Sequence, residues 1–420
     1  MTVQRLRHAG LVVSLSMAIL ATACSDDGGT SGGAAGQAGG VRGVSDDEVR
    51  LGVLASLTTP SGPGFTGFDV GFEARLERAN DEGGVAGRDL TVAEVYDDAG
   101  DVARNLDSAR AAVQTDNLFA LGVVSSAFQP QSSDLLSESE MPFIGAGYMP
   151  GFCGNDWGFG WNGCLLSDDF ANGANVMPII EGLDLDPEGL RWAVLTVDNT
   201  SGQAVVDAVT TVVEETGGTV VFGKASVPAS GVVSDVNPFV RQILAAEPDV
   251  TILNPLLGTS VQLAAGLKAG DYEGAIVTYS GYVPGLLDAS ADTASALDGT
   301  YVVNQFPPQE DDSPAIRQIQ EDLRNIGEED QITLGVGYGY WSADILVQMF
   351  EAVGENLTAE RFNEVVNAGF TYEPALEGGI QRAEFPAFHD EPAPCADLIA
   401  IEDGTYRPLI PLTCYESIPR

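Results

Sequence analysis

The sequence predicts an α/β fold made of two lobes, each a doubly wound parallel sheet covered by helices. Residues 49–98 give the first observation, since they read as a buried strand, a glycine-rich turn, a helix and a second strand. The second is a regular alternation of helical and strand patterns after Asp168, which is typical of parallel sheets with helices on both faces. The third is length, because about 375 residues after the N-terminal segment are too many for one compact core and suit two lobes.

The first predicted elements follow from local residue patterns. Val49–Leu54 is a nearly continuous apolar run, which is typical of a strand buried on both faces. The turn Thr58–Gly67 cannot continue it. Gly71–Asn80 predicts a helix with apolar residues at helical spacing, ended by Gly83 and Gly84, where a positive φ costs little. Leu90–Tyr96 is the next predicted strand.

Two further strands complete the first predicted sheet. Phe119–Ser126 reads F-A-L-G-V-V-S-S and ends in a pair of serines, and Met141–Gly147 reads M-P-F-I-G-A-G. Between them Gln131–Ser139 predicts a helix. We therefore expect the serine pair to lie at the carboxyl end of a strand and just ahead of a helix.

The second set of elements starts after Asp168 and alternates between helix and strand. In chain order it comprises helix Ala174–Gly182, strand Trp192–Val197, helix Gln203–Thr216, strand Thr219–Lys224, helix Asn237–Ala246, strand Val250–Asn254, helix Thr259–Ala269, strand Ala275–Ser280 and strand Gly299–Asn304. The remaining predicted elements are the helices Ala315–Asn325 and Gly339–Glu355 and the strands Leu398–Glu402 and Tyr406–Pro411.

Several motifs resemble one known family. Residues 80–88 read N-D-E-G-G-V-A-G-R, and Y-D-D follows at residues 96–98. With the serine pair and the turn at Gly145–Tyr148, this order resembles the Leu/Ile/Val-type (type I) periplasmic binding proteins, which are the solute receptors of ABC importers. The resemblance implies that the chain passes between the lobes three times to form a hinge. It predicts lobe 1 as residues 47–166 plus 305–374 and lobe 2 as residues 167–304 plus 375–420.

A ligand of such a fold is expected in the cleft between the lobes, beyond the carboxyl ends of the strands. The resemblance implies that Ser125 and Ser126, together with the turn Ala146, Gly147 and Tyr148, hold a ligand carboxylate. Free backbone N–H groups at a helix start favour the same kind of anion. The other interpretation of the two serines is a simple helix cap. Tyr148 departs from the family, which more often has a threonine or serine there.

The second lobe departs further from the amino-acid receptors of the family. Ser280 stands where those receptors place an acid for the ligand ammonium, and their aromatic positions fall near Ser201 and near Leu256. Either another acid meets the ammonium or the ligand has none. Tyr340 matches a family tyrosine, and Phe65 is, like Tyr279 and Tyr282, either an apolar wall of the cleft or part of the core. The ligand classes left open are amides, aromatic acids, differently held hydrophobic amino acids and unrelated small molecules.

The N-terminal segment indicates export. Arg5 and Arg7 precede the apolar run Leu11–Leu20, which is too short to span a membrane, and Ala21-Thr22-Ala23-Cys24 follows. This looks like a lipoprotein signal, residues 1–23, with Cys24 as the lipidated residue; the alternative is an ordinary cleaved signal. Residues 24–46 are then a flexible tether rich in Gly, Ala and Ser. We expect an extracytoplasmic domain anchored to the membrane through lipid.

The chain has five cysteines, so four remain when Cys24 is assigned to lipid. In an exported protein we expect these four to form disulfides. Three pairings are open, and we favour the two local ones, Cys153 with Cys164 and Cys395 with Cys414. The loop between the first two contains two tryptophans that either pack against the lobe or face the cleft. The spacings do not suit a zinc site, so we expect no metal and no cofactor.

The formal net charge is −42, which excludes nucleic acid and anionic lipid surfaces as favoured partners. It reflects either a solvated acidic exterior or an acidic face for cationic ligands. We expect a monomeric binding protein that captures a small molecule and delivers it to ABC permease subunits. The main alternative is a sensor of the same fold that signals to a membrane partner. An exported enzyme is a remote alternative, because the sequence has no G-x-S-x-G, G-K-[ST] or H-E-x-x-H motif.

Overall fold

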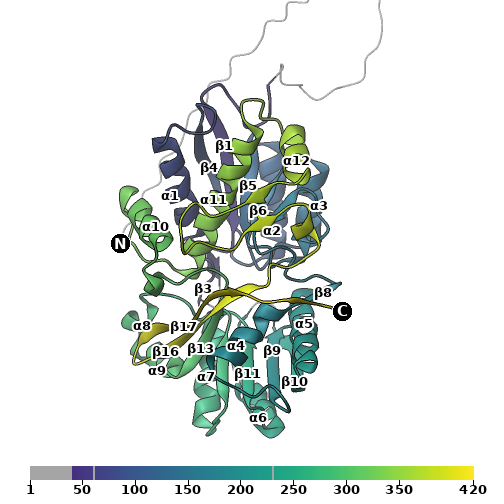
Figure 1. Cartoon of the computed structure of the whole chain (residues 1–420), viewed down its shortest axis with the longest axis vertical. Helices are drawn as coiled ribbons and strands as arrows, with labels where there is room; N and C mark the ends of the chain where they lie inside the picture. Colours follow the sequence, from purple (N-terminus) through teal and green to yellow (C-terminus); the bar gives the residue numbers. More distant parts are fainter. Residues whose placement is uncertain (1–39, 60–61, 229–230) are drawn as a thin grey trace, which may run out of the picture. The chain divides into compact units, whose positions relative to one another are not determined.

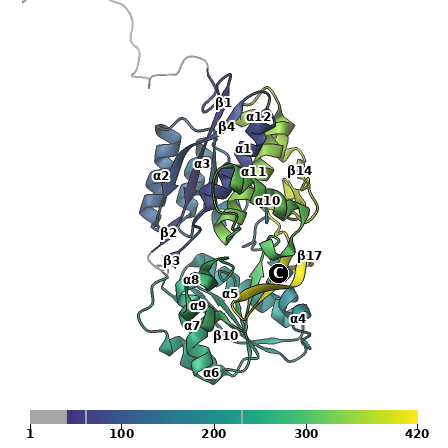
Figure 2. The same ribbon diagram turned by 90° about the vertical axis from the view of Figure 1, so that its left-hand side faces the viewer.

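A computed structural model describes residues 40–59, 62–228 and 231–420 (Figure 1). Its first sheet has the strand order β4-β1-β5-β6-β7, and all neighbouring strands pair in parallel. The strands are β1 (Glu48–Ala55), β4 (Asp89–Asp97), β5 (Ala120–Val124), β6 (Phe143–Gly145) and β7 (Gly158–Gly160). Helices cover both faces of this sheet, with α2 and α3 on one side and α1 and α11 on the other (Figure 2).

The helices around the first sheet explain why β1 is apolar throughout. They are α1 (Phe68–Asp81), α2 (Val102–Gln114), α3 (Pro130–Glu138), α10 (Pro314–Asn325), α11 (Leu334–Val353) and α12 (Ala359–Asn367). Val53 belongs to the core cluster that contains Phe72 of α1, whereas its neighbour Leu54 belongs to the cluster that contains Ala109 of α2 and Leu136 of α3. Successive strand residues point to opposite faces, so a strand covered on both sides must be apolar at every position.

Helices α1 and α11 touch each other through glycines. A Cβ atom added to Gly339 would lie 1.9 Å from the Phe68 carbonyl oxygen, so only glycine permits this approach. The predicted helix start at Gly339 is wrong, because α11 begins at Leu334. Thr333 caps it by accepting a hydrogen bond from Val336 N (3.2 Å), and the glycines that weaken its helical pattern are the residues that let α1 pack there.

The second sheet has the order β10-β9-β11-β12-β13-β16-β17. Its strands are β9 (Arg191–Val197), β10 (Thr219–Val227), β11 (Val250–Asn254), β12 (Ala275–Thr278), β13 (Thr300–Asn304), β16 (Cys395–Glu402) and β17 (Thr405–Cys414). The first five strands pair in parallel, and β16 and β17 add two antiparallel strands at the β13 edge. The predicted α/β class with two parallel sheets is confirmed, and the antiparallel edge is an addition.

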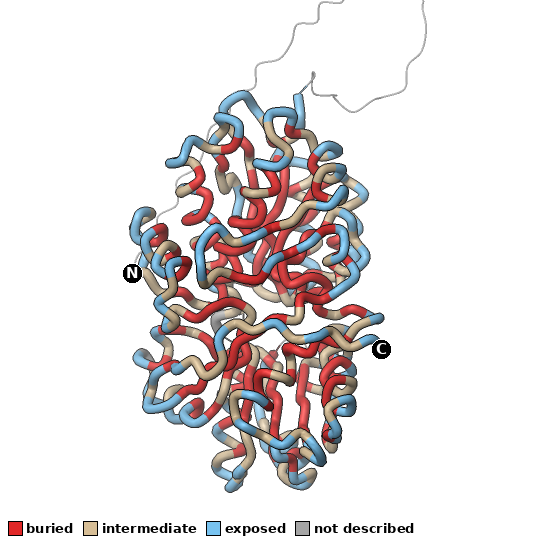
Figure 3. Tube along the Cα trace, viewed as in Figure 1, coloured by how far each residue is buried: buried red, intermediate tan, exposed pale blue. Residues whose placement is uncertain are grey.

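Helices cover both faces of the second sheet as well. They are α4 (Met177–Gly182), α5 (Thr200–Glu215), α6 (Asn237–Ala246), α7 (Leu257–Ala269), α8 (Leu286–Ala289) and α9 (Ala291–Leu297). Val194 packs in the cluster of Val209 on α5, and the next residue, Leu195, packs in the cluster of Leu263 on α7. The central strands of both sheets are buried along most of their length (Figure 3).

Short elements join the larger ones. Three small sheets have two strands each. In them β2 (Thr58–Thr59) pairs with β3 (Gly62–Pro63), β8 (Phe170–Asn172) with β18 (Ser417–Pro419), and β14 (Thr371–Tyr372) with β15 (Ala383–Glu384). Single 3-10 turns occur at η1 (Pro150–Phe152), η2 (Gly173–Asn175), η3 (Gln309–Asp311) and η4 (Ala387–His389).

The chain passes between the two sheets three times. It leaves the first sheet after β7, returns after β13 to form α10, α11 and α12, and enters the second sheet again at β16. Residues 383–389 still lie beside the first sheet, since the Phe385 ring is 5.3 Å from that of Phe159 and His389 Nδ1 is 3.1 Å from Gly158 O. The residue boundaries of the two lobes stay a prediction.

The two local disulfides are present. They join Cys153 to Cys164 and Cys395 to Cys414, the second pair lying opposite each other on β16 and β17. Trp161, inside the first disulfide loop, is fully buried and donates from Nε1 to Ser342 Oγ (3.1 Å). This tryptophan therefore packs against the lobe.

The signal segment and Cys24 lie outside the described residues. Residues 40–46 of the predicted tether are described, and Arg42 fastens them to the first lobe by donating to the carbonyl oxygens of Leu118 (3.1 Å), Ser139 (2.8 Å) and Glu140 (2.8 Å). Among the helices that the structure describes, none has the length and apolarity needed to cross a bilayer.

Candidate ligand-binding site

A cavity of about 200 Å³ lies where the turns of the two sheets face each other. Its walls come from both sheets, and the lining includes Ser126 after β5, Tyr148 after β6, Ser201 in the first turn of α5, Leu256 after β11 and Ser280 after β12. These residues all follow the carboxyl ends of parallel strands, where open α/β sheets bind their ligands. The cavity is therefore the candidate site.

Three aromatic rings line the cavity on the side of the first sheet. The Phe65 centroid lies 5.5 Å from that of Tyr148 and 6.0 Å from that of Tyr338, and the rings of Phe65 and Tyr338 are nearly parallel. Met149 and Leu334 extend this surface. An apolar part of a ligand has a large surface to bury here.

Tyr148 has a hydroxyl group without a partner. Its oxygen is buried and makes no hydrogen bond within the described part of the chain, whereas the Tyr338 hydroxyl donates to Gln305 Oε1 (3.0 Å). Burial raises the pKa of Tyr148 well above its usual value, and Tyr338 and Asp98 raise it further. The hydroxyl therefore keeps its proton, and with less than 1 Å² of accessible surface its oxygen is not exposed to the cavity.

The opposite wall holds uncharged polar groups and two helix starts. Asn199 caps α5 by accepting from Gly202 N (2.8 Å), while Leu256 at the start of α7 offers no side-chain cap. Tyr279 donates to Asn175 O (3.0 Å), and Ser280 donates to Pro255 O (3.1 Å). The positive ends of α5 and α7 favour the negative end of a ligand at this wall.

No residue among the 22 that line the cavity is an acid, a lysine, an arginine or a histidine. The polar lining consists of hydroxyl and amide groups only. A charged ligand group would therefore meet dipoles and hydrogen-bond partners and no side chain of opposite charge.

The structure separates the two predicted serines. Ser126 lines the cavity, but Ser125 is fully buried beneath it and donates to the Asp98 carboxylate. Ser125 Oγ also accepts from Ala127 N (2.9 Å), which fixes the turn after β5. Ser125 thus supports the site from below.

Asp98 was not among the predicted site residues, although it directly ends the Y-D-D motif. It is fully buried and, besides Ser125, accepts hydrogen bonds from Ser56 Oγ (2.7 Å), Gly100 N (2.8 Å) and Asn105 Nδ2 (2.8 Å). Four donors satisfy this carboxylate, so it holds the floor of the cavity in place.

Ala146 and Gly147 do not line the cavity but shape the turn that carries Tyr148. Ala146 is fully buried. Gly147 has a φ of +82°, and a Cβ atom there would lie 2.1 Å from Gly163 O, so the position requires glycine. Of the other predicted residues, Phe65, Ser201 and Ser280 line the cavity with Ser126 and Tyr148.

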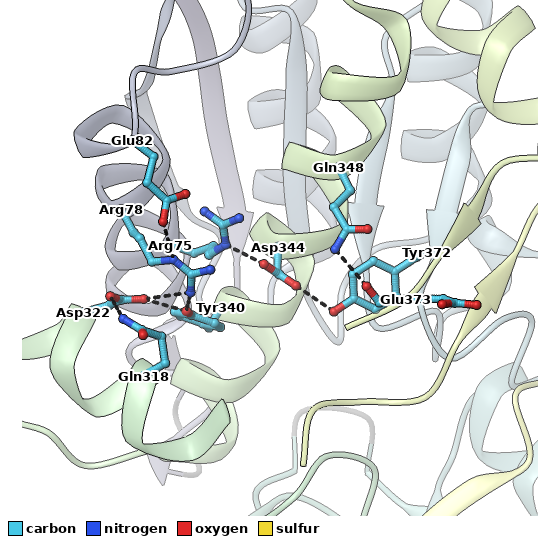
Figure 4. A network of polar contacts seen from close by, with 10 residues as sticks. All are labelled: Arg75, Arg78, Glu82, Gln318, Asp322, Tyr340, Asp344, Gln348, Tyr372 and Glu373. Carbon is cyan, nitrogen blue, oxygen red and sulfur yellow. Dashed lines mark hydrogen bonds and ion pairs between the residues drawn. The ribbon is translucent and has the colours of Figure 1, made fainter. Parts of the chain in front are cut away.

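Tyr340 lies elsewhere, in a polar network between α1, α10 and α11 (Figure 4). Its hydroxyl donates to Asp322 Oδ2 (2.6 Å) and accepts from Arg78 Nη1 (2.9 Å). In the same network Arg75 Nε contacts Asp344 Oδ1 at 2.5 Å. Tyr338, two residues earlier, reaches the cavity instead, because a shift of two positions turns a side chain to the other face of a helix.

Sequence reasoning also missed four amides in the lining, Asn175, Asn199, Asn254 and Gln305. Asn254 is the last residue of β11, Asn199 follows β9 and Gln305 follows β13, so the available signal for these three was their place at strand ends. Tyr282, predicted as wall or core, belongs to the core and donates to Glu310 Oε2 (2.9 Å).

His389 lies outside this cavity. Its ring nitrogens contact Gly158 O (3.1 Å) and Asn367 Oδ1 (2.6 Å), and burial lowers its pKa. Within the described ranges, no group of three or more His, Cys, Asp and Glu side chains is arranged to hold a metal ion.

Residues 48–397 match the model of a family described as periplasmic binding protein. Solved structures with similar folds include a fatty acid ABC transporter substrate-binding protein from Thermomonospora curvata (TM-score 0.72, 19% identity, 90% of this chain and 95% of that one). A second is an R. palustris solute binding protein in complex with 4-hydroxybenzoate (TM-score 0.66, 16% identity, 89% of this chain and 97% of that one). A third is a branched chain amino acid ABC transporter protein from Thermus thermophilus with bound valine (TM-score 0.67, 16% identity, 88% of this chain and 97% of that one). Among curated proteins no sequence match was found. This chain belongs to the periplasmic binding protein family and has the type I fold.

Proposed function

We propose that the chain captures a small organic molecule in the cavity between its two sheets and delivers it to an ABC importer. The observation that carries this proposal is the cavity itself, which is built from strand-end turns of both sheets and combines an aromatic wall with uncharged hydrogen-bonding groups. Solved proteins of the same fold include one with bound valine, one in complex with 4-hydroxybenzoate and one from a fatty acid ABC transporter. They support a small organic acid, amide or amino-acid-like ligand.

The mechanism on this proposal is closure of the two lobes around the solute, without chemistry. The predicted lobes are residues 47–166 plus 305–374 and residues 167–304 plus 375–420, hinged at the three chain passages. Residues 383–389, which pack beside the first sheet, would move with the first lobe. A ligand that touches both lobes binds the closed form more tightly, and it shifts the population by no more than that difference in affinity. A change from mostly open to mostly closed needs about 5 kcal/mol of differential binding.

A thermal-shift screen of residues 40–420 against amino acids, amides, aromatic acids, fatty acids and polyamines tests the proposal. A ligand that binds the folded state raises the melting temperature. Ser201→Trp should abolish that shift by filling the cavity, because Ser201 lines it. Gln203→Trp is the matched control, since Gln203 is exposed in the same turn of α5 and does not line the cavity. Equal shifts in both variants would show that the ligand binds elsewhere.

The anchor is a separate part of the proposal. Cys24 would carry more than one acyl chain, which is the condition for stable attachment to a membrane. The cysteine follows a charged and then apolar leader that is typical of lipoproteins. Cys24→Ser should move the protein from the membrane fraction to the soluble fraction, and sedimentation of the released protein should give the mass of a monomer. A Cys24→Ser protein that still sediments with membranes would contradict the anchor.

A further inference from the structure

We propose that the cavity continues along α5 into the core beside the second sheet as a narrow apolar arm, and that this arm takes a straight hydrocarbon chain of the solute. The arm is the part of the cavity lined by Val197, Val205, Ala208, Tyr279 and Val303. Ala208, at its inner end, sets the length of chain that fits. This inference rests on the proposed function and deepens it by naming the apolar class of the solute.

The first argument is the depth of the cavity along α5. Ser201, Val205 and Ala208 all line the cavity, and their spacing of four and then three residues places them on one face of the helix. Between Ser201 and Ala208 the helix rises by about 10 Å, because each residue adds about 1.5 Å. The cavity therefore follows α5 for two turns and does not stop at the first turn of the helix.

The second argument is the change in exposure along the cavity. Phe65, Ser126 and Ser201 lie where the two sheets face each other, and all three are partly exposed. In the arm, Ala208 is 1% exposed and Val303 is 3% exposed. Both of these residues belong to the apolar core cluster that α5 forms with the second sheet. The arm therefore opens between the two sheets and ends inside this core.

The third argument is that the arm needs no polar partner from the solute. Four of its five lining side chains are those of valine and alanine. The fifth is Tyr279, and its hydroxyl already donates to Asn175 O (3.0 Å). A hydrocarbon chain in the arm leaves this hydrogen bond in place, and removing the chain from water stabilises the complex. A polar group of the solute would find no free partner among these side chains.

The fourth argument is shape. A cavity of about 150 Å³ accommodates one benzene molecule, so a round cavity of about 200 Å³ would hold little more than one ring. Here the same volume extends over about 10 Å along α5, which makes the cavity long and narrow. A straight chain suits this shape, whereas a branched isomer with the same number of carbon atoms would press against the packed core around the arm.

Isothermal titration calorimetry of residues 40–420 with straight-chain carboxylates tests the arm. Butanoate, hexanoate and octanoate should bind in order of increasing affinity, by about 15-fold per step, because each buried CH₂ group contributes about fourfold. The branched isomer 2-propylpentanoate has as many carbon atoms as octanoate and should bind at least about tenfold more weakly, since its second branch has no room. The corresponding primary amides repeat the comparison with an uncharged head group.

Ala208→Leu tests the inner end of the arm. The larger side chain takes the place of the end of a long chain, so octanoate should bind no more tightly than hexanoate, while butanoate keeps its affinity. If that variant does not fold, Ala208→Val should show a smaller loss for octanoate. Ala204→Leu is the matched control, because Ala204 lies one turn earlier in α5 and does not line the cavity. It should keep the chain-length profile of the natural protein.

The inference fails if affinity does not rise with chain length in either series, or if the branched isomer binds as tightly as octanoate. It also fails if the variants of Ala208 bind octanoate as tightly as the natural protein does. In each of these cases, a compound that stabilises the protein in the broad thermal-shift screen would leave the proposed function intact. If no compound binds in the screen or in either series, solute binding itself is contradicted.

Discussion

The Ser125 hydroxyl donates to the Asp98 carboxylate, and both side chains are fully buried beneath the cavity. Ser125 Oγ also accepts from Ala127 N, so the pair fixes the turn on which Ser126 is carried to the cavity wall. Two adjacent serines thus have different roles, since one stabilises the turn and the other faces the solute.

Ser125→Ala should lower the free energy of unfolding by about 1–3 kcal/mol, because the buried Asp98 carboxylate loses a donor. Ser126→Ala should change that free energy by less than about 0.5 kcal/mol, because Ser126 is only partly buried and lies at the cavity wall. It should weaken ligand binding about tenfold on the proposed function. Urea unfolding and calorimetry measure the two effects. Equal losses of stability in both variants would contradict this division of roles.

Gly339→Ala should lower the free energy of unfolding by about 3 kcal/mol, because the new methyl group would lie 1.9 Å from Phe68 O and force α1 and α11 apart. Glu351→Ala on the exposed face of α11 is the control and should change it by less than about 0.5 kcal/mol. Denaturant titrations of both variants provide the measurement. If Gly339→Ala is as stable as the control, the proposed close contact between α1 and α11 at Gly339 is contradicted.

Asp397 should make the protein less stable as the pH rises. Burial raises its pKa well above the usual value, with further contributions from Asp311 and Glu310. Above about pH 4 the unfolded chain has lost this proton while the folded chain still holds it, so stability falls as the pH rises through that interval.

Asp397→Asn should therefore be more stable than the natural protein at pH 7, and the difference should shrink toward pH 4. The variant keeps an oxygen to accept from Asn304 N, as Asp397 Oδ1 does at 3.1 Å. Glu273→Gln removes the same charge at an exposed site and serves as the control. Melting temperatures of the three proteins measured from pH 4 to pH 8 test this prediction. If the advantage of Asp397→Asn grows toward acid pH, the pKa of Asp397 is lowered and not raised.

The two disulfides should affect different properties. Replacing Cys395 and Cys414 by alanine should lower the free energy of unfolding by about 3 kcal/mol, since the bond closes a loop with a sequence separation of 19, and it should leave ligand affinity intact. Replacing Cys153 and Cys164 should also weaken ligand binding, because Leu165 and Leu166 follow directly and line the cavity. Unfolding and calorimetric titrations compare the variants. Unchanged affinity in the second variant would uncouple that loop from the site.

Local patterns predicted the strands well because a strand buried on both faces must be apolar at every position. Local patterns did not predict α2. Its buried residues are Asn105, Ala109 and Ala112, and such small and polar residues give no visible apolar period. Local patterns also placed the start of α11 too late. Its glycines weaken the helical pattern, and the packing of α1 against them is a contact between segments more than 250 residues apart.

The sequence by itself determined the two-sheet α/β fold and the resemblance to the family, and it favoured the local disulfide pairs, because alternation, motif order and short cysteine spacing are local properties of the chain. Tertiary structure decided which side chains reach the cavity. Ser126 lines it while Ser125 bonds Asp98, and Tyr338 lines it while Tyr340 bonds Asp322. The physical reason is the direction in which each side chain points. Neighbouring residues of a turn, or residues two apart in a helix, point to opposite sides, and only packing against distant segments fixes which side faces the cavity.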